Sequence, residues 1–109
     1  MKKVKLYEIA HGRAGDKGEI TNISLFPYNG KHYDLLRKQV TARAVKAHFG
    51  DMVRGEVLRY EVPSIQGLNF VLHGTRSGGV SSAPDLDAHG KSLSFGLLEM
   101  EIEIPGGEG

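Results

Sequence analysis

The clearest alternation of apolar and polar residues lies near the C-terminus, in the stretch LLEMEIEI at residues 97–104. Apolar residues alternate there with three glutamates, which is typical of a half-buried strand with one solvated face. Near the N-terminus, Lys3 and Lys5 alternate with apolar residues around a strand that we place at residues 4–10. Because these two strands carry opposite charges, we expect them to lie side by side.

Two further strands are predicted at residues 20–26 and 56–62, where apolar and polar residues again alternate. The apolar residues of the second share one face: Leu58, Tyr60 and Val62. The stretch SIQGLNFVLHG at residues 64–74 fits two interpretations, a short helix with Ile65, Leu68 and Leu72 on one face, or a strand over LNFVL. We favour the helix.

Apolar residues recur at helical spacing across residues 31–50. Thr41 is the kind of residue that caps the N-terminus of a helix, and Gly50 suits the position after a helix end. This segment is predicted to form one broken helix or two short helices.

The chain has 109 residues, which suits one domain. We place that domain at residues 1–104 and expect residues 105–109 to form a frayed tail. Four to six strands with helices between them predict an α+β fold, with a mainly antiparallel sheet and helices on one face.

Composition excludes several classes of function. The chain has no cysteine, so it has neither a thiol nucleophile nor a cysteine-based zinc site. A net charge of +1 gives no electrostatic footprint for nucleic acid, and no apolar run approaches the length of a membrane span. We therefore expect no nucleic-acid partner, no membrane insertion and a cytoplasmic location.

No metal or cofactor is predicted. The five histidines show no local metal-binding spacing. The stretch DLDAHGKSLSFG at residues 85–96 resembles a calcium loop, but Gly96 stands where the loop needs a bidentate glutamate. We interpret its DAHGK segment as a turn between two strands.

The stretch HGRAGDKG at residues 11–18 concentrates ionisable side chains between glycines, and we interpret it as a loop. Glycines allow backbone N–H groups to form an anion-binding nest, and arginine can grip a carboxylate or a phosphate. The spacing does not match a P-loop. The alternative is a wide hairpin loop with solvated charges. The candidate residues are His11, Arg13, Gly15, Asp16, Lys17 and Gly18.

The stretch HGTRSGG at residues 73–79 echoes the first one, because an arginine again stands beside glycines. Its candidate residues are Arg76, Gly78 and Gly79, and Asn69 before it is a further candidate. We expect both stretches to serve one site. A flexible connection is the alternative interpretation of the second stretch.

The run LYEIAHGRAGDKGEITNISLF, with its HxRxGDKG core and Asn22, resembles the signature of the AtuA-like domain, the C-terminal part of acyclic terpene utilisation proteins. Similar segments follow in LNFVLHG, SGGVSSAPDLDAHGK and LLEMEI. The resemblance implies a ferredoxin-like two-layer sandwich and a link to the catabolism of acyclic terpenes and branched acyl-CoA compounds. It carries over no catalytic residue, and it adds Asn22 to the candidates.

In relatives of this kind the domain follows a much larger N-terminal domain. The resemblance therefore implies a small subunit or binding module that partners an AtuA-type large subunit, with both Gly/Arg stretches presented to a small anionic ligand such as an acyl-CoA or a carboxylate. One alternative is a stand-alone acyl-CoA hydratase or hydrolase with His11 as its base. Another is an oligomerisation module, and we expect a homo-oligomer.

Overall fold

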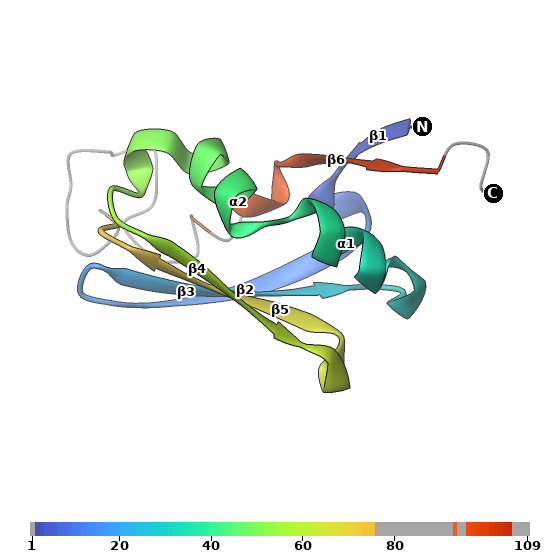
Figure 1. The fold of residues 1–109 in the computed structure, drawn as a ribbon, viewed down its shortest axis with the longest axis horizontal. Helices are drawn as coiled ribbons and strands as arrows, with labels where there is room; N and C mark the ends of the chain where they lie inside the picture. Colours follow the sequence, from blue (N-terminus) through green and yellow to red (C-terminus); the bar gives the residue numbers. More distant parts are fainter. Residues whose placement is uncertain (1, 76–92, 94–95, 106–109) are drawn as a thin grey trace.

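The computed structural model describes residues 2–75, 93 and 96–105, and Figure 1 shows how their elements are arranged. The strands are β1 (Lys2–Lys5), β2 (Ala10–Lys17), β3 (Ile20–Pro27), β4 (Val57–Val62), β5 (Gly67–His73) and β6 (Glu101–Ile104). The helices are α1 (Tyr33–Gln39) and α2 (Ala42–Phe49), with 3-10 turns η1 (Leu6–Glu8), η2 (Gly30–His32), η3 (Gly50–Met52) and η4 (Pro63–Ile65).

The main sheet has four strands in the order β2-β3-β5-β4, and all neighbours run antiparallel. Helices α1 and α2 connect β3 to β4 and lie over one face of this sheet (Figure 1). Strands β1 and β6 form a small second sheet on the side of the helices. The predicted α+β sandwich, with helices on one face of an antiparallel sheet, is therefore confirmed.

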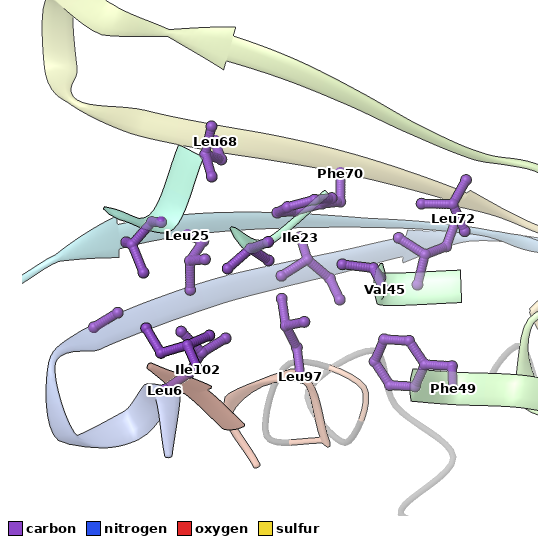
Figure 2. Close-up of a cluster of buried hydrophobic side chains, with 14 of the residues drawn as sticks. Leu6, Ile23, Leu25, Val45, Phe49, Leu68, Phe70, Leu72, Leu97 and Ile102 are labelled. Carbon is purple, nitrogen blue, oxygen red and sulfur yellow. The ribbon is translucent and has the colours of Figure 1, made fainter. Parts of the chain in front are cut away.

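The core lies between the main sheet and the helices (Figure 2). Alternate residues of the two central strands, β3 and β5, point into it, as the two-residue period of a strand requires. The buried apolar side chains of these two strands are Ile23, Leu25, Leu68, Phe70 and Leu72. Val45 of α2 packs against them, and Leu97 closes the core from the C-terminal segment.

The helix favoured for residues 64–74 is wrong. Only a 3-10 turn forms at Pro63–Ile65, and Gln66, with a φ of 53°, ends it in the left-handed region. The remainder is β5, because Phe70 is buried together with the residues two positions either side of it. Ile65, which the helical interpretation would bury, is 59% exposed. Burial of alternate residues of this segment between two neighbouring strands therefore decides its structure, and the helical spacing of Ile65, Leu68 and Leu72 is a coincidence.

The first and last predicted strands pair, as their charges indicated, but both are shorter than predicted. Residues 4–10 are interrupted by the turn Leu6–Glu8, and residues 96–98 are helical, so the last strand begins only at Glu101. Lys5 lies opposite Glu101 in the ladder, and its Nζ is 3.0 Å from a carboxylate oxygen of Glu99.

Residues 31–50 form two short helices, one of the two predicted alternatives. Thr41 caps α2, since its hydroxyl accepts a hydrogen bond from the N–H of Ala44 at 3.0 Å. Gly50 follows α2 with a φ of 57°, a conformation that glycine adopts readily.

Candidate functional site

The stretch HGRAGDKG is a strand, so its interpretation as a loop is wrong. Every residue of β2 pairs with β3, from Ala10 opposite Pro27 to Lys17 opposite Ile20. Only two residues, 18 and 19, connect the strands, and Gly18 takes a φ of 64° as a tight hairpin requires. The other two glycines that suggested a loop, Gly12 and Gly15, lie inside the strand, where they continue the alternation of the residues around them.

That alternation divides β2 between two environments. His11, Arg13, Gly15 and Lys17 are exposed, whereas Ala10 is fully buried. Because directly opposite residues in a ladder share a face, the exposed set lies on the side of the main sheet that faces away from the helices. We call this side the open face.

The ladder registers define the open face as four parallel rows of side chains across the strands. Its residues are His11, Arg13, Gly15 and Lys17 of β2; Ile20, Asn22, Ser24 and Phe26 of β3; Gly67, Asn69, Val71 and His73 of β5; and Leu58, Tyr60 and Val62 of β4. No other helix or strand of the described part of the chain covers this face (Figure 1). Six predicted candidates therefore come together on it: His11, Arg13, Gly15, Lys17, Asn22 and Asn69.

The centre of the open face is polar. The side-chain amide of Asn69 donates to Oδ1 of Asn22 at 2.6 Å and to Oγ of Ser24 at 3.1 Å. The two asparagines were separate candidates in the sequence, and the structure joins them through adjacent strands. Sequence reasoning missed Ser24, although its alternation with Ile23 and Leu25 in ITNISLF indicated the same face.

An aromatic cluster forms one end of the open face. The ring of His11 stacks on Phe26, with centroids 5.5 Å apart, and on Tyr28, with centroids 5.0 Å apart. Gly67 makes room for this cluster, because a Cβ there would lie 2.7 Å from Cε1 of Phe26. Neither Phe26 nor Tyr28 was among the sequence candidates.

The open face carries basic side chains and no acidic one. Arg13 and Lys17 lie along its β2 edge and form no ion pair with any residue that the structure describes. Asp16, a predicted candidate, does not join them, since the register places it opposite Thr21, on the positions that alternate with the open face. An anionic group on this face would therefore meet no carboxylate among the side chains that define it.

Large apolar side chains are also exposed on the open face. Tyr60 is 52% exposed on β4, and Ile20 is 41% exposed on β3. After Val57, which is buried, the alternation of β4 is inverted relative to the usual rule, because Leu58, Tyr60 and Val62 point outward. Arg59 takes the inward position, where its guanidinium donates to the backbone carbonyls of Arg37 and Val40 at 2.6 and 3.1 Å, at the end of α1.

Residues 76–92 lie outside the described part of the chain, so the candidates Arg76, Gly78 and Gly79 and the predicted DAHGK turn lie there too. The residue before them is fixed at the β2–β3 turn. The N–H of Thr75 donates to the carbonyl of Glu19 at 3.0 Å, and its hydroxyl lies 3.0 Å from that of Thr21 in a buried pair. The expectation that both Gly/Arg stretches serve one site stays a prediction.

The described residues around the His11 ring are aromatic. Its ring makes aromatic contacts, and no carboxylate in the described ranges accepts a hydrogen bond from it. Among these same residues, no group of three His, Asp or Glu side chains can hold a metal ion. No helix there has the length and apolar character needed to cross a membrane.

Comparison with known proteins gives one family. Neither the curated proteins nor the solved structures include a significant match to the chain. A family model described as the AtuA ferredoxin-like domain matches residues 4–103, which includes all four strands of the main sheet, both helices and part of each strand of the small sheet. The chain therefore belongs to the AtuA ferredoxin-like domain family, and its α+β sandwich is ferredoxin-like.

Proposed function

We propose that the chain is a non-catalytic binding module that docks through its open face onto the large domain of an AtuA-type protein. The supporting observation is the composition of that face, where exposed Tyr60 and Ile20 accompany Arg13 and Lys17 without any acidic residue. We place this assembly in the catabolism of acyclic terpenoid or branched acyl-CoA compounds, which the family resemblance suggests.

The chemistry of the open face suits a partner protein. Interface cores are enriched in aromatic residues and arginine, and energetic hot spots favour tyrosine and arginine. A sheet face is broad, whereas small-molecule sites are concave and surround most of the ligand. We therefore expect a partner surface that presents carboxylates to Arg13 and an apolar patch to Tyr60.

A binding role also fits the surroundings of His11. A general base must be within reach of the proton it removes, and it is usually oriented by a third group. His11 instead stacks on Phe26 and Tyr28, so that its ring forms part of an aromatic surface. The hydratase or hydrolase alternative has no such observation in its favour.

The test is a calorimetric titration of the chain with a separately produced large domain of an AtuA-type protein. Tyr60→Ala is expected to weaken binding at least tenfold, as truncation of an interface tyrosine commonly does. Arg13→Gln is expected to weaken it several-fold, with a smaller dependence on salt concentration because one charge pair is lost.

Matched controls are available on other surfaces. Tyr7 in η1 is 51% exposed, nearly the same as Tyr60, but lies outside the main sheet, so Tyr7→Ala should leave binding unchanged. Arg43→Gln on α2 removes the same charge as Arg13→Gln from an exposed position on the helix side. Equal losses from the open-face variants and their controls would contradict the proposal. Binding of an acyl-CoA that depends on Arg13, with no binding of the large domain, would replace it with the ligand role.

A further inference from the structure

The outer edge of β2 has backbone groups that no described residue pairs with. The N–H of Tyr28 donates to the carbonyl of Ile9 at 2.9 Å, which makes residues 9 and 28 a hydrogen-bonded pair. Such pairs alternate along an antiparallel ladder, so the odd-numbered residues of β2 bond to β3. The backbone groups of Gly12 and Ala14 therefore point to the outer edge, where no residue of the described chain pairs with them.

Unpaired edges of this length usually carry protection. Proteins cover a long edge strand, bend it with a bulge or interrupt it with proline, because it can pair with another chain. Strand β2 has eight residues, no proline and an unbroken register with β3. Its edge-facing positions include a glycine and two alanines, so small side chains stand beside the free backbone groups.

Gly15 has no evident role within one chain. Its φ is not in the left-handed region, and a Cβ built on it would meet nothing within 4 Å. A glycine inside a strand weakens the strand, and it often marks a close approach by a ligand or another backbone. Gly15 lies on the open face between Arg13 and Lys17, next to the free edge.

We propose that β2 pairs antiparallel with β2 of a second copy of this chain, about a two-fold axis at Ala14, so that Arg13 lies over Gly15 of the second copy. If the two-fold axis passed through Arg13, Arg13 would lie opposite Arg13 of the second copy. If it passed through Gly15, Arg13 would lie opposite Lys17 of the second copy. Both registers place like charges directly opposite each other, which is destabilising. The register about Ala14 avoids both contacts and uses nearly the whole strand.

This pairing joins two main sheets into one sheet of eight strands, with both open faces on the same side. It does not rest on the proposed docking function, since it uses the edge of β2 and leaves Tyr60 on the far edge of each sheet. A single pair of edge strands buries less area than a standard interface, so we expect a weak, concentration-dependent dimer.

The test is sedimentation equilibrium of the full chain from micromolar to near-millimolar concentration, on the wild type and on three substitutions of Gly15. Gly15→Arg places a like charge opposite Arg13 of the second copy at two symmetry-related positions, and should weaken the dimer about two- to thirtyfold. Gly15→Glu places an opposite charge there and should strengthen it by a similar factor. Gly15→Ser is the neutral control: it measures the cost of any side chain at this close approach, and the effects of Gly15→Arg and Gly15→Glu are taken relative to it.

Hydrogen exchange provides a second readout that a change of charge alone does not move. The amides of Gly12 and Ala14 should gain protection as the dimer forms, whereas those of β4 should not. Circular dichroism checks that each variant is folded, which the open space at Gly15 favours. A wild type that remains monomeric over the whole range overturns the proposal. So does a dimer whose dissociation constant is the same for Gly15→Arg and Gly15→Glu.

Discussion

At the scale of single residues, the open face depends on a contact between a glycine and an aromatic ring. Gly67 stands beside Phe26 on neighbouring strands, and Phe26 in turn stacks on His11. Aromatic side chains that cover a glycine on the adjacent strand are a known stabilising device in sheets. The orientation of the aromatic cluster is therefore set by a residue that has no side chain of its own.

Gly67→Ala tests this dependence. Its Cβ would lie 2.7 Å from the ring of Phe26, so the ring must move, and overpacking of this kind costs about 1–3 kcal/mol. We expect a loss of that size in urea unfolding, together with shifted ring signals of Tyr28 in NMR spectra. Gly15→Ala is the matched control, because its Cβ meets nothing and it should not destabilise the chain. Equal stability of both variants would contradict the packing role of Gly67.

At the residue scale, the sequence indicated which ionisable side chains cluster, but it indicated the wrong backbone conformation for them. His11, Arg13 and Lys17 were identified because ionisable groups cluster there, and the structure places them on one exposed face. Their glycine neighbours indicated a loop, yet only Gly18 takes a positive φ in this stretch. Glycine is compatible with strand and loop alike, so its frequency alone does not distinguish them.

At the scale of elements, opposite charges identified a pair of strands that are distant in the sequence. Strands β1 and β6 lie antiparallel with lysines opposite glutamates, as the alternation at both ends of the chain predicted. Lys5 also reaches Glu99, which precedes β6. The hydrogen bond and the charge of Glu99 raise the pKa of the Lys5 ammonium above its usual value of 10.5.

This contact predicts the direction of a pH effect. Because the folded-state pKa of Lys5 is raised, its stabilising contribution is fully present below pH 10.5 and is lost as pH rises through the folded-state value. Glu99→Gln should therefore lower the thermal midpoint slightly at pH 8, and the difference from wild type should shrink as the pH rises above 10.5. High salt should reduce it as well, because the pair is exposed. A difference that is constant with pH would assign the effect to something other than this ion pair.

The prediction for residues 64–74 failed at the same scale, for a reason that lies outside the segment. Leu68 and Leu72 fit both a helical and an alternating pattern, and β-branched and aromatic residues between them do not separate the two. The segment forms a strand because β5 lies between β3 and β4, where Phe70 is fully buried. A single sequence does not show which strands will be its neighbours.

At the scale of the whole molecule, the fold class was predictable and the make-up of the open face was not. Strand alternation and helical spacing were sufficient for an α+β sandwich. The open face needs the register of four strands, which brings Asn22 within hydrogen-bonding distance of Asn69, 47 positions further along the chain. The outward position of Tyr60 likewise depends on Arg59, whose inward side chain caps the end of α1.

The central claim is that the open face binds the large domain of an AtuA-type protein, and side-chain NMR signals test it most directly. An isotope-labelled chain titrated with that unlabelled domain should show changes in the amide groups of Asn22 and Asn69 and in the ring of Tyr60. The side-chain amide of Gln39, which bonds the backbone of Glu103 on the helix side, should stay unchanged. Changes at Gln39 with none at Asn22, Asn69 or Tyr60 would contradict the claim.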